Sequence, residues 1–248
     1  MRILLLCSSF NGLSQRAWIE LRAAEHEVDV RLAGEASTIV TDVRSVDPDL
    51  IICPFLRHRV PREVWEQYRA IIIHPGPPGD RGPSSLDWAI SERATRWGVT
   101  ALQAVEEMDA GPIWASRCFD MPADPPRKSS LYNGPVADAA IELVHEVVAK
   151  AESAGYTGRP LDDRDVDVWG TLRPAMRQAD RAFSWSDRTD EIVRRVRAGD
   201  GSPGVDAELC GVPVAVFDAS PGPALTGEPG SVAGRRHGAV LVRTGDGG

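Results

Sequence analysis

A histidine and an aspartate lie where acid/base chemistry is expected. His74 follows the apolar run 70–73, which is typical of a buried strand, and Asp109 lies in a turn after the next strand-like segment. In open α/β sheets, active sites gather at the carboxyl ends of strands. A carboxylate beside an imidazole fixes the tautomer of the ring and raises its basicity. The pair therefore predicts general acid/base work on a transferring acyl group, with a purely structural histidine as the alternative.

The loop that follows His74 is dense in proline and glycine, in the sequence "HPGPPGDRGPSS". Proline fixes φ and stiffens the chain, which holds a site to a tight tolerance. Glycine lets the backbone approach a ligand closely or adopt positive φ. We therefore expect this loop to be a rigid wall of the site.

Strand-like and helical patterns alternate along residues 1–157. Strand-like runs occur at 2–7, 26–33, 47–55, 69–75 and twice within 98–121, and helical patterns at 13–24, 60–68, 84–95 and 131–155. This alternation predicts an α/β domain of Rossmann type with a mostly parallel sheet. Residues 158–178 are polar and are expected to form a linker. Residues 179–248 then give a short helix and Gly- and Pro-separated strands, expected to form a small OB-like open β-barrel. The last strand-like run stops abruptly at Gly248, which predicts an incomplete barrel and a fragment of a longer protein.

Composition limits the classes of partner. The 28 Lys and Arg against 36 Asp and Glu leave a net charge of −8, which argues against nucleic acid or an anionic membrane as the main partner. No apolar run is long enough to span a membrane, and the start does not fit a secretory signal, so we expect a cytoplasmic protein. None of the four cysteines forms a CxxC pair. We therefore expect reduced thiols and no metal site.

Taken together, "HPGPPGDRGPSSLDWAI" and "GVTALQAVEEMDAGPI" resemble the folate-dependent formyltransferase family. That family shows Asn-x-His-Pro, a loop ending in Arg-Gly and a later Asp-x-Gly turn. His74 matches the family histidine, Arg81-Gly82 the loop end, and Asp109 with Gly111 the aspartate turn. "DRAFSWSDRTDEIVRRVRAGDGSPG", "GEPGSV" and "VRTGDGG" resemble its second domain. The resemblance implies formyl transfer from 10-formyltetrahydrofolate, with His74 as general base or acid and Asp109 orienting it.

One departure from the family pattern concerns the oxyanion. Ile72 stands where the family has an asparagine that helps to hold it, and one such donor is worth ~10²–10³ in rate. Aliphatic residues before the histidine are typical of a narrower group, the amino-terminal halves of [NiFe]-hydrogenase maturation factors. That likeness implies coenzyme A as acceptor, formyl-CoA as precursor of a CO ligand, a fused enoyl-CoA hydratase-like domain, and contact with hydrogenase maturation proteins. Gln103 or backbone N–H groups of the Gly-rich loop would then replace the missing donor.

The resemblance also implies a set of folate-binding residues. Main chain at two strand ends would contact the pterin, and basic or loop residues would hold the glutamate tail or a CoA phosphate. The residues so assigned are Cys53, Pro54, Phe55, Leu56, Arg57, Arg81, Gly82, Ser84, Val105, Glu107, Met108 and Gly111. For the pterin segments the alternative is a plain strand end, and for Arg57 it is a solvated basic patch.

Two other functions remain open from the sequence. The acceptor could be an amine, on a sugar or an aminoacyl group, although the net charge argues against tRNA. The chain could instead bind folate or CoA without turnover, as a scaffold, with Ile72 marking the lost activity.

Overall fold

The computed structural model describes residues 1–248, which divide into two compact units. The first comprises residues 1–85, 96–120 and 132–174, and the second comprises 86–95, 121–131 and 175–248. None of the helices is both long and apolar enough to cross a membrane.

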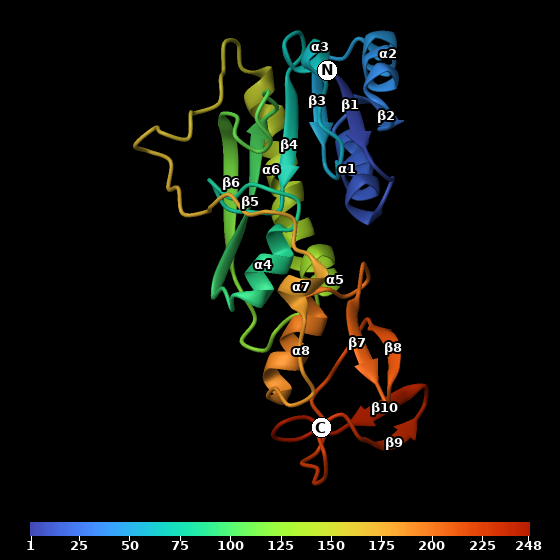
Figure 1. The fold of residues 1–248 in the computed structure, drawn as a ribbon. Coiled ribbons are helices and arrows are strands. Elements are labelled where there is room, and N and C mark those ends of the chain that lie inside the picture. The colour runs from blue at the N-terminus through green and yellow to red at the C-terminus, as the bar shows by residue number, and fades with distance from the viewer. The chain divides into compact units, whose positions relative to one another are not determined.

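The first unit is built on a six-stranded mixed sheet of order β2-β1-β3-β4-β5-β6 (Figure 1). Its strands are β1 Arg2–Cys7, β2 Glu27–Leu32, β3 Leu50–Cys53, β4 Ala70–His74, β5 Arg96–Gln103 and β6 Ile113–Asp120. Strands β1 to β4 pair in parallel, whereas β5 and β6 are antiparallel to their neighbours. The continuous apolar runs of β1, β3 and β4 are buried, as expected for strands covered on both faces. The predicted α/β fold with a parallel core is confirmed.

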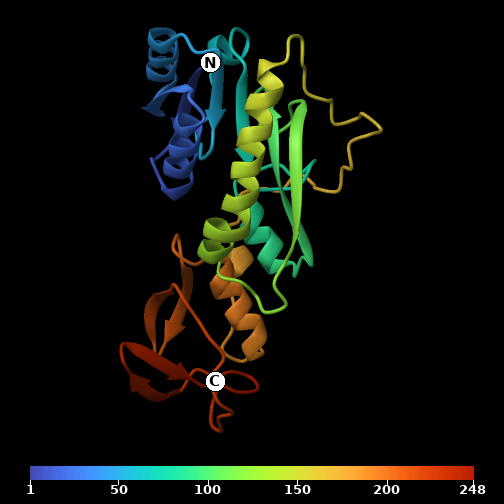
Figure 2. The ribbon, with the colours of Figure 1, turned by 180° about the vertical axis from the view of Figure 1, so that it is seen from behind.

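Helices cover both faces of this sheet. α1 Gly12–Ala23 contacts the long helix α6 Ala137–Glu152, which also packs on β5 and β6 (Figure 2). On the other face, Ile39 and Val43 of α2 Ala36–Val46 and Val64 of α3 Arg62–Trp65 share one core cluster with the central strands. The sequence reading overlooked α2, whose buried residues Ile39, Val43 and Val46 follow a helical period.

The predicted linker has regular contacts of its own within the first unit. Arg159 forms a β-bridge with Ile113, and Leu172 forms a parallel bridge with Arg81. The N–H groups of Trp169 and Gly170 both donate to the Pro78 carbonyl. Residues 168–173 therefore run along the Pro- and Gly-rich loop and hold it.

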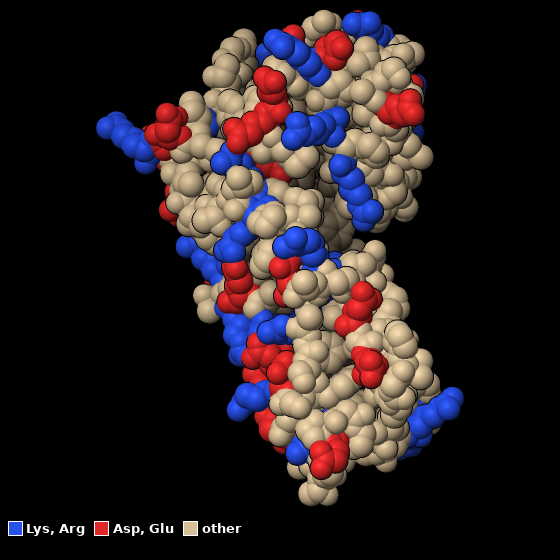
Figure 3. All heavy atoms as spheres, in the orientation of Figure 1, with Lys and Arg blue, Asp and Glu red and all other residues tan.

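The second unit contains short helices and two separate hairpins. Its helical segments are most of α4 Ser85–Ser91, then α5 Lys128–Leu131, α7 Gln178–Arg181 and α8 Thr189–Ala198. β7 Val205–Leu209 pairs with β8 Val212–Val216, and β9 Val232–Arg236 pairs with β10 Ala239–Val242, both antiparallel. The predicted β-rich character is correct, but the strands form two two-stranded sheets and do not join into one barrel sheet. Acidic and basic side chains are interspersed on the face drawn in Figure 3.

Candidate active site

His74 ends β4 and is the centre of the candidate site. Its side chain is 5 % exposed, and it alternates along the strand with Ile73, so that it shares a sheet face with Ile72. His74 Nε2 lies 2.8 Å from Oδ2 of Asp80, and Nδ1 lies 3.6 Å from Oδ2 of Asp109. The imidazole is therefore flanked by a carboxylate at each nitrogen.

The position of Asp109 beside His74 does not follow from the rule that active sites gather at the carboxyl ends of parallel strands. Because β5 is antiparallel to β4, its last residue Gln103 pairs with Ile71, and Ala104 N–H donates to the Ala70 carbonyl. The loop 104–112 begins beside the start of β4 and must fold back along that strand for Asp109 to meet His74. Asp109 adopts φ +54°, a left-handed conformation that is uncommon outside glycine and is found at functional sites.

Two loops close around the pair through direct contacts. The Gly82 N–H donates to Oδ2 of Asp109 at 3.1 Å, and Arg81 Nη1 pairs with Oε1 of Glu107 at 2.6 Å. A Cβ on Gly111 would lie 1.8 Å from the Gln103 carbonyl oxygen, so only glycine fits there. The structure thus brings Gly82 and Asp109 together beside His74, and it joins the same two loops through Arg81 and Glu107.

Burial and charge act on His74 in opposite directions. Burial lowers the pKa of the imidazole, but the hydrogen bond to Asp80 and the charges of Asp109 and Asp80 outweigh it and raise the pKa above its ordinary value. His74 is therefore held toward its protonated form.

Asp80 is the residue that sequence reasoning missed. It is 2 % exposed and accepts a hydrogen bond from His74. A signal was available, since a carboxylate six positions after the histidine in a stiff loop is close enough to reach it. The carboxylate partner of His74 was assigned to Asp109 alone, because the turn at Asp109 matches the family pattern.

Gln103 does not reach the side of the sheet where His74 lies. It pairs with Ile71, whereas His74 pairs with Thr100, so the two side chains point to opposite faces. Its Oε1 accepts the indole N–H of Trp114 at 3.3 Å. The structure gives no support to Gln103 as an oxyanion donor. Ile72 occupies the face of His74 and packs against the apolar core.

The loop after β3 carries a second set of predicted residues. Cys53 and Pro54 are buried, Phe55 and Leu56 are half-buried, and Arg57 is exposed. Burial raises the pKa of the Cys53 thiol far above its ordinary value, so only the main chain of this residue can serve a ligand. Ser8 Oγ accepts the Arg57 N–H, and the Phe55 carbonyl accepts the Ser8 N–H, which tie this loop to the end of β1. Arg57 lies over the Phe55 ring at 5.2 Å.

The remaining predicted ligands lie on the two loops that border His74. Ser84 follows the Gly-rich loop and is half-buried, as is Val105. Met108, one residue before Asp109, is 37 % exposed and available to a ligand. No group of three or more His, Cys, Asp or Glu side chains is arranged to hold a metal ion.

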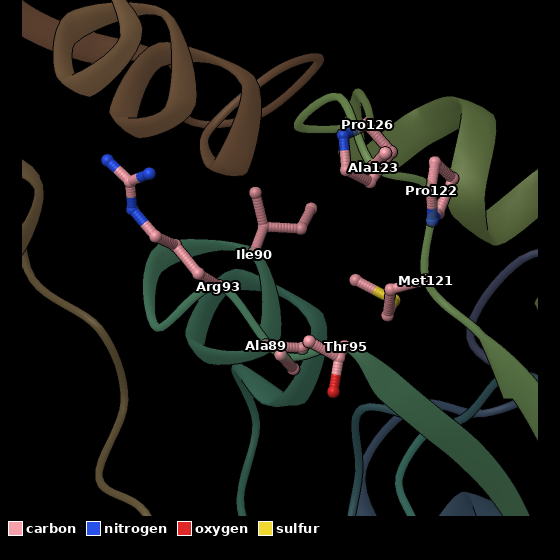
Figure 4. A pocket seen from close by; sticks show the side chains of 9 residues that line it. Ala89, Ile90, Arg93, Thr95, Met121, Pro122, Ala123 and Pro126 are labelled. Atoms are coloured by element: carbon pink, nitrogen blue, oxygen red, sulfur yellow. The ribbon is translucent and has the colours of Figure 1, made fainter.

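A separate cavity of about 320 Å³ lies within the second unit. Ile90 and Met121 face each other across it, and Arg93 stands at its rim (Figure 4). None of the predicted site residues lines it, so this cavity is distinct from the pair at His74.

The chain belongs to the formyl transferase family. The family described as "Formyl transferase" matches residues 12–148, and "Formyl transferase, C-terminal domain" matches residues 175–248.

Two relatives match over the whole chain. Hydrogenase maturation factor HoxX of Bradyrhizobium diazoefficiens is 42 % identical over 248 residues, covering 100 % of this chain and 43 % of the relative. The crystal structure of HypX from Aquifex aeolicus in complex with tetrahydrofolic acid matches with a TM-score of 0.93 at 42 % identity, covering 100 % of this chain and 43 % of that one. The chain thus spans less than half of the length of these relatives. Methionyl-tRNA formyltransferase from Clostridium thermocellum shares the fold, with a TM-score of 0.68 at 14 % identity over 98 % of this chain and 96 % of that one.

Proposed function

We propose that this chain transfers a formyl group from 10-formyltetrahydrofolate to the thiol of coenzyme A, in the maturation of a [NiFe] hydrogenase. The observation that carries the proposal is the buried His74–Asp109 pair at the predicted family positions, in a chain with full-length similarity to HoxX and HypX. The HypX relative was crystallised with tetrahydrofolic acid, which supports a folate donor here.

In this proposal His74 exchanges a proton with the acceptor or with the leaving folate nitrogen, and Asp109 orients the ring. The loops after β3, β4 and β5 supply the folate contacts, through main chain at residues 53–56 and 105–108 and through the side chains of Arg57 and Arg81. Ser84, Gly82 and Gly111 shape the wall of the same site. Localisation in the cytoplasm, where folate and CoA are available, belongs to the same proposal.

A thiol acceptor fits the chemistry of a site without the family asparagine. Ile72 cannot donate a hydrogen bond to the oxyanion of the tetrahedral intermediate. A thiol has a pKa near ~8.5 and forms its nucleophilic anion far more readily than an alcohol does. A thiol acceptor therefore needs less help from a base than an alcohol does, while the oxyanion still needs a donor in place of the missing asparagine.

The test is incubation of the purified chain with 10-formyltetrahydrofolate and CoA, followed by mass spectrometry for formyl-CoA. We expect formyl-CoA to form in proportion to the folate released. A formylated amino sugar or aminoacyl amine in place of formyl-CoA would transfer the proposal to an amine acceptor. Tight folate or CoA binding with no product from any acceptor would make the chain a scaffold and refute catalysis.

A further inference from the structure

His74 has a second carboxylate partner besides the aspartate of the family pattern. Asp80 accepts a hydrogen bond from Nε2 at 2.8 Å, and both side chains are at least 95 % buried, with exposed fractions of 5 % and 2 %. We propose that Asp80 is a positioning residue that keeps the His74 ring protonated at both nitrogens, so that His74 acts as a proton and hydrogen-bond donor and not as the base that activates the acceptor. The inference rests on the proposed function for its catalytic meaning, but the state of the ring can be tested without it.

The argument begins with the hydrogen-bonding capacity of imidazole. A neutral ring has one N–H and one lone pair, whereas the imidazolium has two N–H groups. Between two ionised carboxylates, a neutral ring would direct its lone pair at negative oxygen. The imidazolium faces both carboxylates with N–H groups and carries the opposite charge.

The charged groups around the ring come from two elements. Asp80 is on the loop after β4, and Asp109 is on the loop between β5 and β6. Their combined effect raises the pKa of His74 although burial acts against it. The Arg81 guanidinium, adjacent to Asp80 in sequence, is paired with Glu107. Oδ2 of Asp109 accepts the Gly82 N–H as well as facing the imidazole.

Two glycines, Gly76 and Gly170, leave room for the contact between Asp80 and His74, because a side chain at either position would collide with it. A Cβ on Gly76 would lie 2.2 Å from Oδ2 of Asp80 and 2.6 Å from Nε2 of His74. A Cβ on Gly170 would lie 2.0 Å from the Asp80 amide nitrogen. The Asp80 N–H also donates to the Pro77 carbonyl at 2.9 Å. The carboxylate is therefore held in place by its own loop and by the segment that covers it.

A doubly protonated His74 changes its part in the transfer. Nε2 is engaged by Asp80, whereas the nearest carboxylate oxygen to Nδ1 lies 3.6 Å away, beyond hydrogen-bond distance. In this inference the Nδ1–H is the group that donates to the reacting atoms. It stabilises the oxyanion with a positive charge, which makes up for the hydrogen bond that Ile72 cannot give.

Proton and electron-pair movements then balance as follows. The thiol of the acceptor releases its proton to water, and the thiolate sulfur bonds to the formyl carbon. The bond from that carbon to N10 of the folate breaks as Nδ1 gives its proton to N10. His74 regains a proton from water, and Asp80 keeps the ring charged for the next turnover.

The deciding measurement is the protonation state of the ring in the free protein. The chain has five histidines, so a ¹⁵N-histidine-labelled sample with a His74→Gln spectrum beside it identifies the His74 nitrogens by NMR. At pH ~7.5, above the ordinary histidine pKa of about 6.5, we expect both His74 nitrogens to carry protons. In Asp80→Asn we expect the pKa of His74 to fall, since an adjacent opposite charge that favours the imidazolium is removed. A wild-type spectrum with one protonated nitrogen at this pH overturns the inference.

A matched control variant and a pH profile distinguish a positioning role of Asp80 from a purely structural one. Asp138→Asn removes an exposed carboxylate that pairs with Arg16, and it should leave the His74 spectrum unchanged. The raised pKa makes His74 active below that pKa, so kcat/KM should fall as pH rises through it. In Asp80→Asn this fall should move to lower pH, which a loss of folded protein alone would not do; an unmoved profile contradicts the inference.

The two proposals can fail separately. If His74 is an imidazolium but the chain makes no formyl-CoA, the role of Asp80 in setting the charge stands and the proposed function is refuted. If the chain makes formyl-CoA but His74 titrates at its ordinary pKa, the proposed function stands and the inference about Asp80 is refuted.

Discussion

Two buried aspartates, one in each unit, have opposite kinds of partner. In the first unit Asp80 faces a titratable imidazole that a second carboxylate also faces. In the second unit Asp87 is 8 % exposed and contacts two fixed cations, Arg181 at 2.7 Å and Lys128 at 3.3 Å. Burial raises the pKa of Asp87, against the lowering effect of Lys128 and Arg181.

The difference shows how to tell a reactive cluster from a structural one. An arginine stays charged under all ordinary conditions, so Arg181 has no proton to exchange with Asp87. An imidazole can titrate, and when protonated it can deliver a proton. Burial and ion pairing alone therefore do not identify a site; the ability of the partner to titrate does.

The largest expected effect is on turnover at the titratable cluster. His74→Gln should lower kcat/KM for formyl transfer by about 10²–10⁴, because it removes the proton-transfer group. His145→Gln is the matched control, since His145 is half-exposed on α6 and pairs with Glu20. The rate is measured by formyl-CoA formation. A His74→Gln chain that keeps its rate would remove His74 from the chemistry.

A second effect compares the stability contributed by the two aspartates. Asp87→Asn should lower the free energy of unfolding by about 3 to 5 kcal/mol, because Arg181, 2 % exposed, would be left charged and unpaired. Asp80→Asn should cost only about 1 to 3 kcal/mol, since His74 can release its proton. Urea unfolding followed by tryptophan fluorescence measures both. Equal losses would show that the two clusters do not differ as described.

A third effect compares two glycines, one in each unit. Gly111→Ala should destabilise the first unit by about 1 to 3 kcal/mol, since its Cβ would collide with the Gln103 carbonyl oxygen. Gly234→Ala in β9 should change stability by less than about 0.5 kcal/mol, as nothing lies within 4 Å of the added Cβ. Thermal unfolding of both variants gives the comparison. An unaffected Gly111→Ala chain would refute the tight approach of the loop 104–112 to β5.

The smallest effect concerns the exposed cation after β3. Arg57→Gln should raise KM for 10-formyltetrahydrofolate by about two- to five-fold, as exposed ion pairs are worth up to ~1 kcal/mol. Arg62→Gln is the control, because Arg62 is also exposed and lies near an aromatic ring, over Trp65 at 6.0 Å. Higher salt should reduce the difference. A KM equal to that of the control would assign Arg57 to a solvated patch.

Most of the first unit could be predicted from local pattern. The continuous apolar runs of β1, β3 and β4 predict strands buried on both faces, and β4 leads directly to His74. The second unit was harder, because its strands are short and largely exposed, as in β9, where only Gly234 is half-buried. Weak alternation in such strands fixes neither their pairing nor their number, so only the structure shows that they pair as two antiparallel hairpins.

Parts of the candidate site could not be predicted, for two physical reasons. The direction of β5 depends on which strand it pairs with, and this places Gln103 on the face opposite His74. The spacing of six residues allows Asp80 to reach His74, but the path of its loop depends on residues 168–173, which are distant in sequence and were expected to form a linker. Neither contact leaves a local signal in hydrophobic periodicity.

The sequence by itself determined the α/β pattern, the family and the presence of a histidine at the end of a buried strand, because these depend on residue type and short-range spacing. Only the tertiary structure decided that His74 lies between two carboxylates and that Gln103 lies away from it. Those facts depend on how loops far apart in the chain pack together, and the electrostatic state of a buried imidazole is set by that packing.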